Sequence, residues 1–257
     1  MKDFSKICFA GVIPARYASS RFAGKPLAII GNKPMIQRVY EQASKALNKV
    51  YVATDDERIY KCVENFGGKV IITSSHHLSG TDRCSEAVTK IEDEIGEKID
   101  VVINIQGDEP FIKPEQITAL MNCFANEDAE IATLIRKTET DENLFNPNQP
   151  KVVINSKGEA IYFSRSVIPF IRDFEMTEWS KKHNFFKHIG LYAYKTKTLS
   201  EITKLPRSPL EIAESLEQNR WIENGYKIMT AITDWESIGI DTPEDLEKAK
   251  LMLLKTD

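Results

Sequence analysis

The sequence has few cysteines and histidines, and none of them has the spacing of a disulfide framework or a zinc site. The two adjacent histidines, His76 and His77, lack the i, i+4 helical spacing that aims two imidazoles at one metal. The four cysteines are scattered without a CxxC pair: Cys8, Cys62, Cys84 and Cys123. In a chain of this size such cysteines are typical of reduced packing residues. A disulfide-stabilised scaffold and a zinc site are therefore not expected.

Long apolar runs and an excess of positive charge are also absent. The N-terminal apolar run from Ile7 to Ala15 is too short to span a bilayer and is interrupted by Pro14. We therefore expect neither a signal peptide nor a membrane anchor, and we expect a cytoplasmic location. The 34 basic and 38 acidic residues give a net charge of -4. Since binding to phosphate backbones needs a basic excess, a general nucleic-acid binder is not expected.

The chain carries neither of the two common glycine-rich nucleotide motifs, GxGxxG and GxxxxGK[ST]. A dinucleotide fingerprint and a Walker loop are thereby excluded. Its 257 residues can bury a sizeable core. We expect one α/β domain, residues 1–257, with a smaller lobe inserted at about 152–195.

A polar loop near the N-terminus carries the strongest chemical signal in the sequence. Residues Ile7 to Ile13 are apolar and partly β-branched, which predicts a buried strand that Pro14 should end. The loop that follows, residues 15–26, combines small residues with three cations: Arg16, Arg21 and Lys25. Open α/β sheets hold phosphate-bearing ligands at such a strand end, so the loop predicts a polyphosphate site.

Strands and helices alternate through the first half of the chain, which predicts a mostly parallel sheet. Strands are expected at 49–54, 69–73, 100–105 and 130–136, and helices at 33–47, about 55–66, 84–94 and 114–126. In the second half we expect a hairpin at 152–164, strands at 188–194 and 228–232, one continuous helix at 210–223 and a last helix from 241. The acids of the helix at 210–223, including Glu211, Glu214 and Glu217, should form a solvated stripe.

Several polar residues allow both a structural and a chemical interpretation. Ser79 or Thr81 could cap the helix that follows or contact a ligand, and the pattern does not choose. Asp108 directly follows a buried strand, where a carboxylate and substrate phosphates can hold Mg²⁺, so we favour a metal site there. Asp241, by its spacing from Glu244, favours a helix cap.

Eight blocks of sequence, spread over nearly the whole chain, resemble the 3-deoxy-manno-octulosonate cytidylyltransferases, also called CMP-Kdo synthetases. They are GVIPARYASSRFAGKPL, VATDDERI, SGTDR, NIQGDEP, YFSRSVIPF, HIGLYAY, ESLEQNRW and GIDTPEDLE, in this order. The resemblance implies a Rossmann-like, mostly parallel sheet of the nucleotide-diphospho-sugar transferase type, with a smaller strand-containing lobe used for dimerisation. It also implies a homodimer and a role in lipopolysaccharide biosynthesis.

The resemblance also assigns site residues by position. It implies that the CTP triphosphate contacts Arg16 and Lys25, with the Ala15 backbone nearby, and that the cytosine side contacts Ser79, Gly80 and Gln106. It implies Mg²⁺ ligands at Asp108 and Asp241, against the capping interpretation of Asp241. For the acid sugar 3-deoxy-D-manno-octulosonate (Kdo) it implies Arg165 at the carboxylate and His188, Glu217 and Gln218 at the hydroxyls. Arg16, Lys25 and Asp108 would be the catalytic residues.

The implied reaction is attack by the 2-hydroxyl of Kdo on the α-phosphorus of CTP, giving CMP-Kdo and pyrophosphate. The chain departs from the commoner family pattern at Ala23, where many members have proline, and at Ser237-Ile238-Gly239, where a Gly-Thr-Gly run is frequent. Two alternatives stay open: a cytidylyltransferase for a related acid sugar such as 8-amino-Kdo or a sialic acid, and a sugar-nucleotide-binding glycosyltransferase or non-catalytic module.

Overall fold

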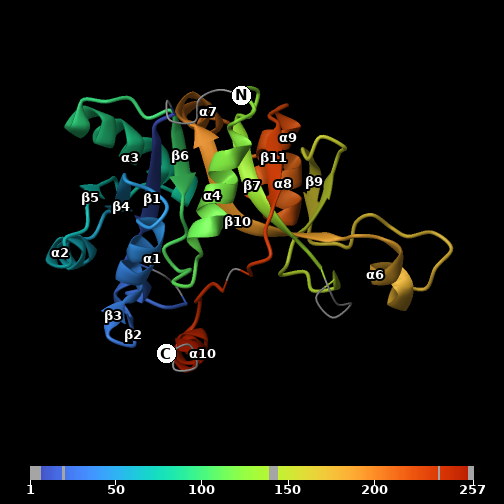
Figure 1. The fold of residues 1–257 in the computed structure, drawn as a ribbon, viewed down its shortest axis with the longest axis horizontal. Coiled ribbons are helices and arrows are strands. Elements are labelled where there is room, and N and C mark those ends of the chain that lie inside the picture. Colours follow the sequence, from blue (N-terminus) through green and yellow to red (C-terminus); the bar gives the residue numbers. More distant parts are fainter. Residues whose placement is uncertain (1–6, 19–20, 139–143, 237, 254–257) are drawn as a thin grey trace. The chain divides into compact units, whose positions relative to one another are not determined.

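The computed structural model describes residues 7–18, 21–138, 144–236 and 238–253 (Figure 1). Ser19, Ser20 and Ser237, which belong to motifs noted above, lie outside the described residues, as do 139–143. The chain divides into two compact units. Of the described residues, 7–18, 21–118 and 238–253 belong to the N-terminal unit, and 119–138 and 144–236 belong to the second unit.

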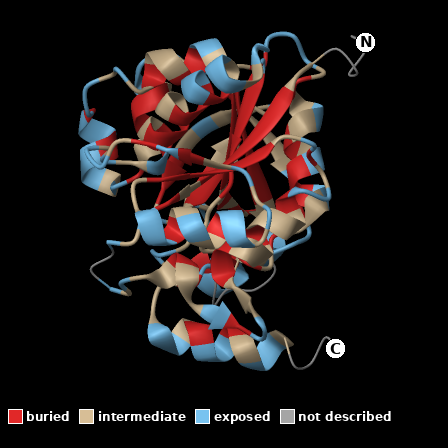
Figure 2. Ribbon diagram, turned by 90° about the vertical axis from the view of Figure 1, so that its left-hand side faces the viewer, coloured by how far each residue is buried: buried red, intermediate tan, exposed pale blue. Residues whose placement is uncertain are grey.

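The N-terminal unit is built on four parallel strands in the order β6-β1-β4-β5. Their bounds are β1 (Phe9–Ala15), β4 (Val50–Thr54), β5 (Val70–Ile72) and β6 (Val101–Asn104). In the register, Gly11 lies opposite Val50 of β4 and Ile103 of β6. Nearly all of these strand residues are buried, as expected of a parallel sheet covered on both faces. Figure 2 shows the strands mostly in the red of buried residues.

Helices connect these strands and supply the rest of the core. They are α1 (Met35–Ala43), α2 (Glu57–Asn65), α3 (Gly80–Ile95), α4 (Pro114–Cys123), which leads into the second unit, and α10 (Pro243–Leu253). A short 3-10 helix η2 (Lys25–Leu27) and the two-stranded β2 (Ile29–Ile30) and β3 (Lys33–Pro34) precede α1. Ile240 and Leu246 pack with Ile30 and Met35, so the C-terminal segment is part of the N-terminal unit's core.

The second unit contains a mixed sheet. Its strands are β7 (Ile131–Lys137), β8 (Lys151–Ile154), β9 (Ala160–Ser164), β10 (Phe186–Lys195) and β11 (Ile228–Ile232). Strand β11 is parallel to β7, whereas β10 is antiparallel to both β7 and β8, and β8 is antiparallel to β9. Its helices are η3 (Met176–Glu178), α6 (Trp179–Lys182), α7 (Thr196–Ile202), α8 (Pro209–Glu214) and α9 (Glu217–Glu223).

The predicted fold class, an α/β protein with a mostly parallel sheet, is confirmed, and the hairpin at 152–164 is present as β8 and β9. The prediction that Pro14 ends the first strand is wrong, since Pro14 lies opposite Ala53 and the ladder runs on to Ala15. A proline ring fixes φ near a value that extended chain accepts and removes only its own donor, so the strand tolerates it. The lobe predicted at about 152–195 stays a prediction.

The predicted single helix at 210–223 is wrong. Helix α8 ends at Glu214, Ser215 adopts a left-handed φ of 51°, and α9 begins at Glu217. The Glu214 carboxylate accepts hydrogen bonds from the Ser164 hydroxyl at 2.6 Å and the Arg165 amide at 3.0 Å. It is therefore held against β9 and does not belong to a solvated stripe, and Glu211 is itself buried beside its capping partner Ser208.

Candidate active site

A cavity of about 510 Å³ lies at the carboxyl ends of β1 and β6 in the N-terminal unit. Residues from β1, η2, the start of α3 and the segment after β6 line it. The lining includes all eight residues predicted for the nucleotide and the metal: Ala15, Arg16, Lys25, Ser79, Gly80, Gln106, Asp108 and Asp241. The cavity thus brings together three segments that are far apart in the sequence. They are the loop after β1, the residues at the start of α3 and the residue Asp241 just before α10.

Two glycines allow the backbone segments around the cavity to approach closely. A Cβ on Gly107 would lie 3.0 Å from the Pro14 carbonyl oxygen, and a Cβ on Gly80 would lie 3.2 Å from the Pro14 ring. Such contacts are tighter than nine in ten real Cβ contacts, so a side chain at 107 would require the end of β1 to shift by a few tenths of an ångström. Gly107 therefore allows the close approach of the end of β1 to the segment that carries Asp108.

Lys25 is the electrostatic centre of this cavity. Its Nζ lies 2.6 Å from Asp108 Oδ2 and 3.1 Å from Asp241 Oδ1, and Arg21 Nη1 lies 3.2 Å from Asp241 Oδ2. The Lys25 side chain is only 15% exposed, so water screens these charges incompletely. The two carboxylates converge on one cation, the Lys25 ammonium.

The start of α10 leaves the Asp241 carboxylate available for this pairing. The Thr242 hydroxyl accepts the Asp245 amide at 3.2 Å, and the Asp245 carboxylate accepts the Thr242 amide at 3.2 Å. Thr242 therefore caps the helix, and the interpretation of Asp241 as the cap is wrong. The Ile240 amide donates to the Asp108 carbonyl oxygen at 3.0 Å, which ties the two acid-bearing segments together.

Ser79 caps helix α3, one of the two roles that the sequence left open, while its ligand contact stays a prediction. It begins α3 as the N-cap, accepting the Asp82 amide at 3.1 Å while Asp82 accepts the Ser79 amide at 3.1 Å. Ser79 and Gly80 also line the cavity. The first turn of a 16-residue helix therefore borders the cavity, and its amide groups and dipole favour anions.

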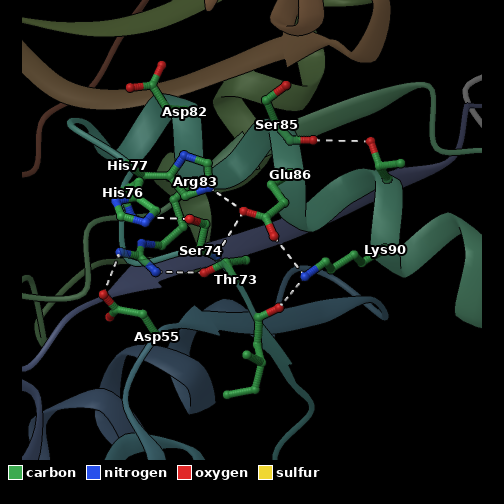
Figure 3. A network of polar contacts seen from close by, with 12 residues as sticks. Asp55, Thr73, Ser74, His76, His77, Asp82, Arg83, Ser85, Glu86 and Lys90 are labelled. Atoms are coloured by element: carbon green, nitrogen blue, oxygen red, sulfur yellow. Dashed lines mark hydrogen bonds and ion pairs between the residues drawn. The ribbon is translucent and has the colours of Figure 1, made fainter.

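Two further cavity residues, His77 and Arg83, belong to the network in Figure 3. Arg83 is 3% exposed, donates to the Thr73 hydroxyl at 2.6 Å and lies 3.4 Å from Asp55 Oδ2. His77 contacts Glu86, which also accepts the Ser74 amide at 2.9 Å and pairs with Lys90.

Burial raises the pKa of Glu86, but hydrogen bonds from Lys90, the Ser74 amide and His77 outweigh burial and bring that pKa down to about 2. The carboxylate is therefore ionised at neutral pH. It keeps His77 and the loop after β5 in place beside the cavity.

The residues predicted to bind the acid sugar lie in the second unit. The Arg165 guanidinium donates to three carbonyl oxygens, those of Glu214 at 2.7 Å, Pro147 at 3.0 Å and Ser215 at 3.3 Å. A guanidinium carries five N–H groups, so two of them have no hydrogen-bond partner among the described residues and could meet a carboxylate. Arg165 thus spans the break between α8 and α9 and is held in one orientation.

His188 lies in β10 among aromatic rings, 5.1 Å from the Phe163 ring and 5.3 Å from the Tyr192 ring. Its Nε2 is 3.1 Å from the Thr133 hydroxyl oxygen. Desolvation lowers the pKa of His188 to about 3. The imidazole is therefore neutral at neutral pH and can exchange hydrogen bonds with a ligand hydroxyl without carrying charge.

Helix α9 presents buried polar atoms that lack partners among the described residues. They include Gln218 Nε2, Asn219 Oδ1 and Trp221 Nε1, and Arg220 Nε also lacks a hydrogen bond, although it lies 3.7 Å from Glu211 Oε2. Glu217, at the start of the helix, accepts from Arg220 Nη2 at 2.7 Å. Buried polar groups are nearly always hydrogen-bonded, so these atoms are candidates for contact with a polar ligand.

Comparisons with known proteins agree on one family. A cytidylyltransferase family profile matches residues 10–228. A relative from Parabacteroides distasonis named 3-deoxy-manno-octulosonate cytidylyltransferase is 60% identical over 249 residues, covering 95% of this chain and 98% of that protein. One of the same name from Thermodesulfovibrio yellowstonii is 52% identical over 94% of this chain and 96% of its own. The chain belongs to the 3-deoxy-manno-octulosonate cytidylyltransferase family.

Solved structures agree with this family. CMP:2-keto-3-deoxy-manno-octonic acid synthetase complexed with CTP matches with a TM-score of 0.88 and 40% identity, covering 97% of this chain and 100% of the other. A 4-diphosphocytidyl-2C-methyl-D-erythritol synthase from Anaerococcus prevotii, 12% identical with a TM-score of 0.62, shares the fold alone. The glycosyltransferase and non-catalytic alternatives are not favoured by these relatives.

Arg83, His77 and Trp221 lie at these sites of the cytidylyltransferase and were not predicted from the sequence. A signal for Arg83 was present, since it follows Ser79 and Gly80 in the SGTDR block. Trp221 gave no such signal, because an aromatic residue on a periodic helix is typical of core packing.

No cluster of three or more His, Cys, Asp or Glu side chains suited to a metal, and no helix long and apolar enough to cross a membrane, occurs in the described part of the chain.

Proposed function

We infer that this cytidylyltransferase activates Kdo with CTP, giving CMP-Kdo and pyrophosphate. The observation that carries this inference is the convergence of Lys25, Asp108 and Asp241 in a cavity bordered by the phosphate loop and the start of α3. Family membership supplies the base and the sugar, since the named relatives act on 3-deoxy-manno-octulosonate.

In this reaction the 2-hydroxyl oxygen of Kdo forms a bond to the α-phosphorus of CTP. The bond from that phosphorus to the bridging oxygen of the β-phosphate breaks, and pyrophosphate leaves with that electron pair. Arg16 and Lys25 bind the phosphate oxygens and stabilise the charge on the departing group. We assign no general base to the hydroxyl proton.

We propose that Asp108 and Asp241 together hold Mg²⁺. Their fit rests on the two carboxylates that already converge on one cation, because Mg²⁺ prefers one or two carboxylates plus substrate phosphates. When bound, the ion would neutralise negative charge on the phosphates. Lys25 would then leave the carboxylates and move to the triphosphate oxygens, so the chain's own contribution is a lysine that exchanges partners.

For the sugar we propose Arg165 at the carboxylate and His188, Glu217 and Gln218 at the hydroxyls. The fixed orientation of Arg165 favours a bidentate pair with a planar carboxylate. The unpartnered Gln218 Nε2 and the neutral His188 favour uncharged hydroxyl groups.

We further propose that the enzyme is a homodimer that acts in the cytoplasm in lipopolysaccharide biosynthesis. In support of self-association, the exposed large apolar side chains of the second unit include Ile161, Phe170, Phe174 and Met176. Exposed apolar patches often mark protein interfaces. Light scattering on the purified chain tests the dimer, and a monomer at micromolar concentration would reject it.

A pyrophosphate-release screen tests the reaction. CTP, UTP, GTP and ATP are each combined with Kdo, 8-amino-Kdo and a sialic acid in the presence of Mg²⁺. We expect release only with CTP, and fastest with Kdo. Faster release with another acid sugar would assign the enzyme to that sugar, and CTP binding without release on any acid sugar would reject catalysis.

A further inference from the structure

Arg58, on the surface of α2, stacks on Tyr17 of the phosphate loop. The guanidinium carbon lies 3.2 Å from the centroid of the tyrosine ring. Arg58 is locked in this place by Asp56, which accepts from Arg58 Nε at 2.9 Å and from Nη2 at 2.6 Å. Asp56 is in turn fixed as the N-cap of α2. The guanidinium is therefore preorganised against the ring.

Tyr17 contacts the other end of the loop, at Gly24, through both its backbone and its ring. Its carbonyl oxygen accepts the Gly24 amide at 2.9 Å. Gly24 has a φ of 72°, and a Cβ there would lie 3.0 Å from Tyr17 Cε2. The ring thus contacts the Arg58 guanidinium and the Gly24 backbone, and only glycine allows this approach.

This arrangement joins the two ends of the loop that carry the phosphate-binding cations. Tyr17 directly follows Arg16, and Gly24 directly precedes Lys25. Arg16 and Lys25 line the cavity, whereas Tyr17, Gly24 and Arg58 are not among its lining residues. Arg58 pairs with Asp56 and stacks on Tyr17, and it does not line the cavity. Its influence on the loop therefore acts through the stack and not through contact with a bound ligand.

We propose that Arg58 and Tyr17 are positioning residues for the CTP triphosphate. Their stack, with Gly24, sets the separation and direction of Arg16 and Lys25 before the nucleotide arrives. This inference rests on the proposed CTP-dependent function of the same cavity. A loop held in its binding geometry loses less freedom when the ligand binds, so the stack strengthens CTP binding without touching it.

The test compares Arg58→Gln, Tyr17→Leu and Tyr17→Phe with the parent enzyme. Lys61→Gln is the matched control, since Lys61 lies on the same helix, pairs with Glu57 and is 68% exposed. CTP affinity is measured by calorimetry, KM for CTP and for Kdo by pyrophosphate release, and loop order by hydrogen exchange of residues 16–27 without nucleotide.

Arg58→Gln should weaken CTP binding about two- to fivefold, the range of an exposed cation–π contact. Tyr17→Leu should weaken it about tenfold, because the packing on Gly24 is lost as well. Both variants should speed exchange in residues 16–27 and leave the KM for Kdo unchanged. Tyr17→Phe, which keeps the ring, and Lys61→Gln should behave like the parent.

Three results would overturn the inference. The first is unchanged CTP affinity and exchange in Arg58→Gln. The second is an equal loss in Lys61→Gln, which would assign the effect to charge on α2 in general. The third is a Tyr17→Phe variant as weak as Tyr17→Leu, which would assign it to the hydroxyl. If the parent binds no CTP the proposed function fails, and the exchange comparison still decides whether the stack orders the loop.

Discussion

The two units of this cytidylyltransferase hold their functional side chains in opposite ways. In the N-terminal unit the charged residues pair with one another, as Lys25 does with Asp108 and Asp241. In the second unit Arg165 is bonded to backbone carbonyls and Gln218 Nε2 has no partner among the described residues. Under the proposed roles, triphosphate binding would require charged groups to change partners, whereas the sugar carboxylate would meet an arginine already held in one orientation.

The largest effect on activity is expected from removing the charge of Asp108, which pairs with Lys25 in the N-terminal unit. Asp108→Asn keeps the shape but removes half of the proposed metal site, and the rate of pyrophosphate release should fall by about a thousandfold. Circular dichroism should show an unchanged fold. Asp93→Asn, an exposed position on α3, serves as the control. A rate within tenfold of the parent would reject the assignment of Asp108 to the metal.

Replacing the lysine separates its two proposed roles. Lys25→Met should lower kcat/KM for CTP by about a hundredfold, because the triphosphate loses a cation. The same variant should bind Mn²⁺ more tightly without nucleotide, since no ammonium competes for the carboxylates. Electron paramagnetic resonance measures the free Mn²⁺, with Lys45→Met as the control. Unchanged Mn²⁺ affinity would show that the lysine ammonium does not compete with the metal ion for the two carboxylates.

A change in the second unit should affect the sugar alone. Gln218→Ala should raise the KM for Kdo about tenfold and leave the KM for CTP within twofold, because one buried hydrogen bond to the ligand is lost. The free energy of unfolding should change little, since Gln218 Nε2 has no partner among the described residues. Initial rates at varied Kdo and CTP, with a thermal melt, measure both. An equal rise in both KM values would contradict a sugar-specific role.

The smallest expected effect concerns stability near the nucleotide cavity. The folded pKa of Glu86 is about 2, below its ordinary 4.5, so its contribution to stability is complete above about pH 4.5 and is lost as the pH falls toward 2. Glu86→Gln should remove this part of the pH dependence. Urea unfolding of both proteins between pH 6 and pH 3 measures it. If the free energies of unfolding of the two proteins changed with pH in the same way, the lowered pKa of Glu86 would be contradicted.

Much of the first unit could be predicted from the sequence. Apolar runs and the polar segments that end them located β1, β4, β5 and β6, and residues at the carboxyl ends of parallel strands must share one edge of the sheet. That rule alone placed Arg16, Lys25 and Asp108 near one another. Neither periodicity nor turn signals showed that these charges would neutralise one another, because ion pairs join residues 83 and 216 positions apart.

The sequence by itself thus determined the fold class, the family and the edge of the sheet that carries the charged cavity. Only the tertiary structure decided which polar side chains are already hydrogen-bonded or ion-paired within the protein. Glu214 belongs to a periodic helical pattern, yet its bonds to β9, about 50 residues away, accompany a break in the helix at Ser215. Asp241 has the spacing of a cap, yet Thr242 takes that role. Local patterns report which face of an element is apolar, whereas the partners of a polar group depend on segments that the fold alone brings together.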